Sequence, residues 1–275
     1  MNNFGHPPRL WIMRIALLQI TSGADKMANL KLVREAATDA AHQGARLLIF
    51  PEATSQAFGT GRLDKQAEDI HSGDFATALQ DLAQELDVVI IAGMFTPADT
   101  IERDGKTISR VHNTALITGA GLHEGYNKIN TYDAFGYRES DTVKPGSELK
   151  IVEVDGVKVG VTICYDLRFP GLFQDLARAG AEVIVAPTSW QDGEDKLEQL
   201  QVISRARALD STSWVLMCDQ ARPTEERKGP AGIGHSMVID PTGKVQATAG
   251  YGVETIFADV DVSGLDKTRE AIPVL

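Results

Sequence analysis

Short apolar runs alternate with longer amphipathic stretches along the first part of the chain. The runs at 13–20, 46–50 and 88–95 are almost continuously apolar, which is typical of strands in a sheet covered by helices on at least one face. Between these runs, apolar residues recur at helical spacing over 24–43 and 74–86. This alternation predicts an α/β architecture.

The same order of elements returns in the second part of the chain. Apolar runs at 157–164, 182–187 and 213–220 predict three further strands, and helices are predicted over about 170–180 and 194–210. The order of the elements repeats, although the amino-acid sequence itself does not. It predicts two related α/β halves that pack sheet against sheet, with their helices on the outside.

Each half also contains a predicted β-hairpin. In 112–128 and in 234–250, two apolar or alternating runs flank a turn that contains glycine. No stretch rich in Pro, Gly or Ser separates the halves, so we expect one domain over 13–275. The sequence leaves two interpretations of residues 1–12, a disordered arm or the product of a misplaced translation start.

The composition argues against several classes of function. The 275 residues include 38 acidic and 27 basic side chains, a formal net charge of −11, whereas nucleic acids and anionic membranes attract clustered Lys and Arg. No run approaches the roughly 18 apolar residues of a membrane span. Two cysteines in a chain of this length make no disulfide framework, which indicates a reducing, cytoplasmic setting. We therefore expect neither nucleic acid nor a membrane as a partner.

One of the two cysteines lies where a nucleophile would be expected. In VGVTICYDLRFPGLF, residues 159–173, Cys164 ends a buried strand, and Pro170 suits the first turn of the next helix. Backbone N–H groups in such an elbow can point at a thiol and at a developing oxyanion. The alternative is a small buried hydrophobe, since free cysteines are often inert. Cys218, inside a predicted strand, is interpreted as core.

A thiol nucleophile needs a base and a positive charge. A Cys/His pair is one alternative, but none of the six histidines lies at a strand end beside turn residues. Glu52 follows a buried strand and a proline, where burial raises a carboxyl pKa toward neutrality, unless it is a solvated loop residue. Lys128 at the end of the first hairpin is either the cation or a surface lysine. H-x-H and H-E-x-x-H spacings are absent, which disfavours a zinc hydrolase.

Three sequence segments together identify a protein family more specifically than any one of them alone. FPEA around Glu52, YNKIN around Lys128 and ICYDLRFP around Cys164 occur in this order, with the flanks VHNTALI, YRESDTVKPG, APTSW and GHSMVIDPTG. From Met13 onward the chain closely resembles the nitrilase superfamily of carbon–nitrogen hydrolases. The resemblance implies a four-layer α-β-β-α sandwich with two pseudo-symmetric halves. It also implies a glutamate–lysine–cysteine triad, made here of Glu52, Lys128 and Cys164.

The resemblance carries further expectations. Many members have a second active-site glutamate, for which Glu139 in YRESD is the candidate. The implied reaction is cysteine-dependent hydrolysis of a small amide through a thioester, with release of ammonia and without metal or cofactor. Family members assemble as homodimers or larger homo-oligomers, so the same is expected here.

The expected substrate is a terminal amide of a small carboxylate-bearing compound. CYDLRFP and GHSMVIDP are similar to the branch that includes omega-amidases and deaminated-glutathione amidases. Arg168 is a candidate for binding the substrate carboxylate, or else for a structural ion pair with Asp166 or a helix C-terminus. Tyr165 and Trp190 are candidates for lining the pocket. The alternatives are an N-carbamoyl-amino-acid hydrolase, a nitrilase, and a catalytically silent interaction protein on the same scaffold.

Overall fold

Two six-stranded β-sheets form the centre of the molecule, and the computed structural model describes residues 11–134, 137–225, 227 and 229–275. The first sheet contains, in spatial order, β14 (Glu254–Asp261), β1 (Ile12–Gln19), β2 (Leu47–Ile49), β3 (Val89–Arg103), β4 (Lys106–Gly119) and β5 (Leu122–Asn127). The second contains β13 (Val245–Thr248), β12 (Met237–Ile239), β11 (Trp214–Asp219), β10 (Val183–Thr188), β9 (Val157–Val161) and β8 (Ile151–Val154).

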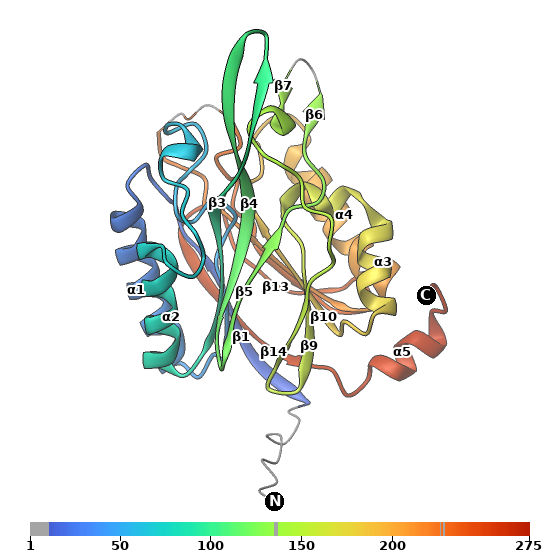
Figure 1. The fold of residues 1–275 in the computed structure, drawn as a ribbon. Coiled ribbons are helices and arrows are strands. Elements are labelled where there is room, and N and C mark those ends of the chain that lie inside the picture. Colours follow the sequence, from blue (N-terminus) through green and yellow to red (C-terminus); the bar gives the residue numbers. More distant parts are fainter. Residues whose placement is uncertain (1–10, 135–136, 226, 228) are drawn as a thin grey trace, which may run out of the picture.

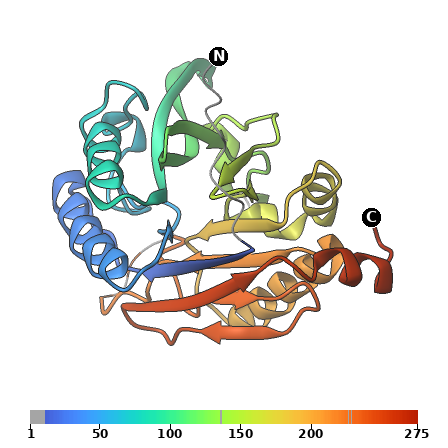
Figure 2. The same cartoon turned by 90° about the horizontal axis from the view of Figure 1, so that it is seen from below.

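Helices cover the outer faces of both sheets (Figures 1 and 2). On the first sheet lie α1 (Lys26–His42) and α2 (Asp74–Leu86), and on the second lie α3 (Pro170–Arg178) and α4 (Lys196–Ser211). The predicted four-layer sandwich of two related halves is therefore confirmed. The shorter elements are η1 (Leu63–Lys65), β6 (Asp133–Ala134), β7 (Tyr137–Arg138), η2 (Glu139–Asp141), η3 (Cys164–Arg168) and α5 (Leu265–Ala271).

Strand β1 shows why the predicted strands are apolar at nearly every position. Ile15 and Leu17 belong to the core between the two sheets, whereas Ala16 and Leu18 belong to the core between the first sheet and its helices. All four side chains are fully buried. Because successive side chains of a strand point to opposite faces, a strand covered on both faces has no polar alternation.

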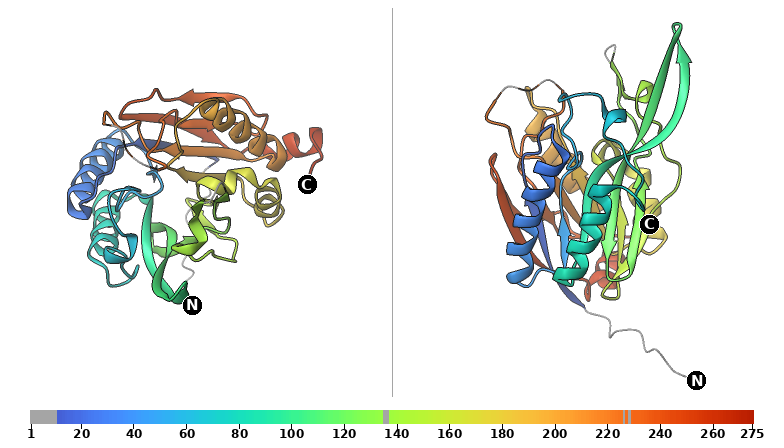
Figure 3. Two further views of the ribbon diagram at one scale, coloured as in Figure 1. Left: turned by 90° about the horizontal axis from the view of Figure 1, so that it is seen from above. Right: turned by 60° about the vertical axis from the view of Figure 1, so that its left-hand side comes forward.

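The hairpin of β3 and β4 extends beyond the sheet (Figures 1 and 3). The sequence predicted strands only over 88–95 and from 112 onward, so the outer parts of both strands were missed. These outer parts are mostly exposed or half-buried, whereas the inner parts over 89–95 and 113–119 are buried. Because these parts contain many polar residues, they show no apolar run that would predict a strand. Cross-strand pairing nevertheless continues to Arg103 and Lys106, with an irregularity after Pro97.

The sequence also missed β8, β14 and α5. Strand β14 follows the second half in the chain but pairs antiparallel with β1 of the first sheet, from Ile12↔Asp261 to Gln19↔Glu254. Its residues are mostly exposed or half-buried, so its pattern is weak. The second half therefore adds a strand to the first sheet, which the repeat of organisation did not predict.

The first strand starts close to where the apolar pattern predicts it. Strand β1 begins at Ile12, one residue before the predicted start at Met13. Residues 1–10 of the proposed arm lie outside the described residues. In the part of the chain that the structure describes, the helices are too short or too polar to cross a membrane.

Candidate active site

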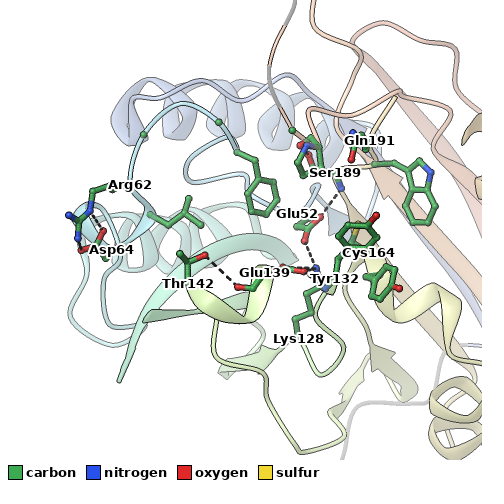
Figure 4. A pocket seen from close by; sticks show the side chains of 18 of the residues that line it. Glu52, Arg62, Asp64, Lys128, Tyr132, Glu139, Thr142, Cys164, Ser189 and Gln191 are labelled. Carbon is green, nitrogen blue, oxygen red and sulfur yellow. Dashed lines mark hydrogen bonds and ion pairs between the residues drawn. The ribbon is translucent and has the colours of Figure 1, made fainter. Parts of the chain in front are cut away.

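A cavity of about 1090 Å³ opens where strands of both sheets end. Glu52 follows β2, Lys128 follows β5, Cys164 follows β9 and Ser189 follows β10, and all four line this cavity (Figure 4). All seven residues singled out in the sequence belong to its wall: Glu52, Lys128, Glu139, Cys164, Tyr165, Arg168 and Trp190.

The loop that carries Glu52 lies tightly against β3. A Cβ atom on Gly93 of β3 would lie 2.7 Å from Glu52 Cα and 2.5 Å from Ala53 N. Only glycine permits this approach, because such distances are well below van der Waals contact. Gly93 N–H also donates to Pro51 O at 3.0 Å, and Gly93 O accepts from Ser55 N–H at 3.0 Å. The sheet thus fixes the backbone of Glu52.

The Glu52 carboxylate is buried, and three donors surround it. Asn113 Nδ2 donates to Oε1 at 2.7 Å, Ser189 N–H donates to Oε2 at 2.9 Å, and Lys128 Nζ lies 3.4 Å from Oε1. Burial raises the pKa of Glu52 above its ordinary value, and the nearby Lys128 ammonium opposes this rise. A carboxylate with a raised pKa is a base suited to near-neutral pH.

The Lys128 ammonium lies between two carboxylates (Figure 4). Its Nζ is 2.8 Å and 3.0 Å from the two oxygens of Glu139, and Tyr132 N–H donates to Glu139 Oε2 at 2.8 Å. Burial alone lowers the pKa of Lys128, but Glu139, Glu52 and Cys164 together raise it well above its ordinary value. Lys128 therefore stays positively charged inside the protein.

Cys164 occupies a strained turn directly after the second-sheet strand β9. Its φ of +46° is left-handed, a conformation that non-glycine residues seldom adopt. Burial and the charge of Glu52 raise the pKa of the thiol well above its ordinary value, while Lys128 and the Ser189 N–H oppose this. The resting site therefore contains a protonated thiol beside a buried carboxylate.

Asp166 holds the turn around Cys164 in place. Its fully buried carboxylate accepts hydrogen bonds from Ile163 N–H at 2.9 Å, Tyr126 OH at 2.7 Å and Asn130 N–H at 3.0 Å. Because Asn130 follows Lys128 by two residues, Asp166 connects the cysteine turn of one half with the lysine loop of the other.

Arg168 does not form the ion pair with Asp166 that the sequence left open. Its Nη2 donates to Gln199 Oε1 at 2.9 Å, and its guanidinium carbon lies 5.0 Å from the centre of the Trp190 ring. In the described part of the chain, Arg168 forms no ion pair, so its charge is not neutralised by an acidic side chain. Tyr165 packs edge-on against Tyr132, with ring centres 5.2 Å apart.

Among the described residues, this cavity has neither the histidine that a Cys/His pair would need nor a group of side chains that could form a metal site. Its wall contains no histidine from the described residues, which goes against a Cys/His pair. The described residues also contain no group of three or more His, Cys, Asp or Glu side chains able to hold a metal ion.

Sequence reasoning missed the contact residues Asn113, Ser189 and Asp166. Asn113 lies in VHNTALI and Ser189 in APTSW, two segments that carried the resemblance. Their place in these segments was the sequence signal that could have pointed to the two residues. Asn113 meets a carboxylate 61 positions earlier in the chain, and Ser189 meets the same carboxylate from the other sheet. Periodicity describes local structure and does not report such contacts.

Comparisons with known proteins identify the family. The sequence model of the carbon–nitrogen hydrolase family matches residues 14–270. A Mycobacterium tuberculosis protein named as a hydrolase is 45% identical over 274 residues, which cover 96% of this chain and 94% of that protein. The omega-amidase NIT3 of Saccharomyces cerevisiae is 30% identical over 275 residues, covering 95% of this chain and 91% of its own. The crystal structure of Saccharomyces cerevisiae Nit3, a member of branch 10 of the nitrilase superfamily, has a TM-score of 0.82 at 27% identity and covers 96% of this chain and 95% of that chain.

Proposed function

This chain belongs to the carbon–nitrogen hydrolase family and is a hydrolase acting on amides, and we propose that it uses Cys164 as its nucleophile. The expected substrate is an omega-amide of a small carboxylate-bearing compound. The observation that carries the proposal is the presence of Glu52, Lys128 and Cys164 in one cavity wall, with the carboxylate buried and the lysine charged.

The first half of the proposed reaction forms a thioester. Glu52 accepts the thiol proton of Cys164, and the sulfur attacks the amide carbonyl carbon. The Lys128 ammonium and the backbone N–H of Tyr165 stabilise the oxyanion, a contribution of about 10²–10³ in rate for one such donor. Glu52 then returns the proton to the leaving nitrogen, and ammonia departs.

The second half releases the acid. Glu52 accepts a proton from a water molecule, whose oxygen attacks the thioester carbonyl carbon. The C–S bond then breaks, the carboxylic acid leaves, and Glu52 returns the proton to the sulfur of Cys164. Glu139 is proposed as the second active-site glutamate, which orients Lys128 through its two short contacts. No metal, cofactor or histidine takes part in this scheme.

Substitution of the nucleophile tests the proposal. Cys164→Ala should lower ammonia release by about 10⁴-fold or more, and Glu52→Gln by about 10²–10⁴-fold. Intact-mass analysis of Glu52→Gln after incubation with substrate should detect an acyl adduct on Cys164. Full activity of Cys164→Ala would overturn the proposal. Failure of a thiol-reactive amide analogue to label Cys164 in the native protein would favour a catalytically silent interaction protein.

Arg168 is proposed to bind the substrate carboxylate. Its planar guanidinium is held by Gln199 and Trp190 without a competing carboxylate in the described chain. Arg168→Lys should raise KM for acidic omega-amides by about tenfold, because bidentate geometry is lost, and leave KM for neutral amides unchanged. Arg178→Lys on the exposed side of α3 is the matched control. Equal effects on both substrate types would assign Arg168 a structural role.

Measured rates of hydrolysis distinguish the possible substrate classes. The relatives named as omega-amidases support omega-amides as the substrate class. N-carbamoyl amino acids and nitriles are the alternative substrate classes. Ammonia release should be fastest from omega-amides in a panel of all three. We also propose a cytoplasmic location, in line with two free cysteines, and a homo-oligomer, which rests on the family resemblance alone. Light scattering of the purified protein and fractionation of native cells test these two points.

A further inference from the structure

One residue outside the proposed triad contacts two of its members. The side chain of Asn113, on β4, donates from Nδ2 to Glu52 Oε1 at 2.7 Å. Its backbone oxygen accepts from Lys128 N–H at 2.9 Å. Asn113 is 1% exposed, and strand pairing with Phe95 of β3 fixes its position. A single rigid residue therefore places the base and the lysine loop relative to each other.

The other end of the Asn113 side chain carries an unusual feature. Its Oδ1 is fully buried and has no hydrogen-bond partner among the described residues. A buried acceptor without a partner destabilises the folded state. An apolar side chain of the same size would leave no unpaired acceptor here, but it would also remove the donor to the buried Glu52 carboxylate, so what the amide contributes lies in that donor.

We propose that Asn113 is a positioning residue, which holds Glu52 in the charge state and orientation that allow it to accept the Cys164 proton. This inference rests on the proposed role of Glu52 as the base. A donor at 2.7 Å stabilises the ionised carboxylate and fixes Oε1, so that the carboxylate stays ionised despite its burial.

Several charged groups around Glu52 influence its ionisation together with Asn113. Lys128 favours the ionised carboxylate, while Glu139 on η2 and Asp219 on β11 disfavour it, and the Cys164 thiol contacts it from the second sheet. The Asn113 amide is a neutral donor in this set. It supports ionisation at all pH values, because it does not itself titrate.

Two variants separate this role from a structural one. Asn113→Leu removes the donor and the unpaired Oδ1 at nearly constant volume, and Asn113→Asp places a second carboxyl group against Glu52. The acid limb of kcat/KM should move to higher pH by roughly one to two units in Asn113→Leu and further in Asn113→Asp, where two carboxyl groups share a proton. Activity at pH 7 should fall by about tenfold or more, and any loss of Tm in Asn113→Leu should be smaller at pH 5 than at pH 8, where the ionised Glu52 carboxylate lacks its donor. Thr118→Val, which removes a buried hydroxyl elsewhere on β4, is the control and should leave the limb in place.

A second measurement does not depend on turnover. The rate of alkylation of Cys164 by iodoacetamide, followed by peptide mass spectrometry between pH 5 and 9, should show the same order of acid limbs. If the alkylation limb of Asn113→Leu coincides with that of the native protein, the inference is wrong, whatever the substrate. If the native protein hydrolyses no amide but the alkylation limbs shift in the predicted order, the proposed function fails and the inference stands.

Discussion

At the scale of single residues, the site depends on one cation buried among acids. Lys128 contacts Glu139 at 2.8 Å and faces Glu52 at 3.4 Å, and all three side chains are almost completely buried. A buried charge without a partner is costly, so the lysine is needed for the fold as well as for the proposed reaction. In the proposed reaction, the Lys128 ammonium also contacts the oxyanion.

Replacing this lysine should therefore produce a pH-dependent loss of stability. Lys128→Met should lower the free energy of unfolding by about 3–5 kcal/mol near pH 8, because two carboxylates lose their buried partner. The folded-state pKa of Glu52 is already raised, and it rises further without the ammonium. A raised folded pKa means that stability is retained at low pH and lost as the pH rises through that pKa, so the deficit should shrink toward pH 5. Urea unfolding at pH 5 and pH 8 measures this; an equal deficit at both values would contradict it.

At the scale of elements, the proposed base is placed by a close contact between a loop and a strand. Gly93 of β3 leaves room for the Glu52 backbone, whereas a Cβ there would lie within 2.7 Å of Pro51 O and Glu52 Cα. The adjacent strand β4 then supplies Asn113, and the loop after β10 supplies the Ser189 N–H. Three elements thus orient one carboxylate.

A single methyl group at this contact should disturb both activity and stability. Gly93→Ala should lower kcat/KM by about 10²-fold, because a displacement near 1 Å is enough for such a loss, and destabilise the fold by about 1–3 kcal/mol. Gly171→Ala in α3 is the matched control, since a Cβ there meets nothing within 4 Å. The control should retain activity and gain up to about 1 kcal/mol. Steady-state kinetics and thermal unfolding report both effects; native kinetics in Gly93→Ala would exclude this role for the contact.

At the scale of the whole molecule, the two sheets create two different environments for sulfur. Cys218 on β11 lies in the core between the sheets, where its Sγ donates to Ile49 O of the first sheet at 3.1 Å. Cys164 lies at the cavity wall and is 8% exposed, whereas Cys218 is fully buried. Burial raises the pKa of the Cys218 thiol, which makes it still less reactive.

The folded protein should therefore react at one thiol and the unfolded protein at two. Ellman's reagent should titrate one equivalent under native conditions, two in denaturant, and none natively in Cys164→Ala, because only Cys164 is accessible. Cys218→Ala should leave the native titration at one equivalent. Rapid labelling of both native thiols would contradict the packing of the two sheets around Cys218.

The sequence by itself determined the principal strands and helices and the two-halved organisation, and its resemblance to the carbon–nitrogen hydrolases singled out the candidates Glu52, Lys128 and Cys164. It could do so because strands buried on both faces leave continuous apolar runs, and because strand ends mark where side chains meet a crevice. Only the tertiary structure decided that β14 joins the first sheet, that Arg168 contacts Gln199 and not Asp166, and that Asn113 and Ser189 contact Glu52. These features depend on long-range pairing and on the packing of one sheet against the other, and neither leaves a periodic pattern in the chain.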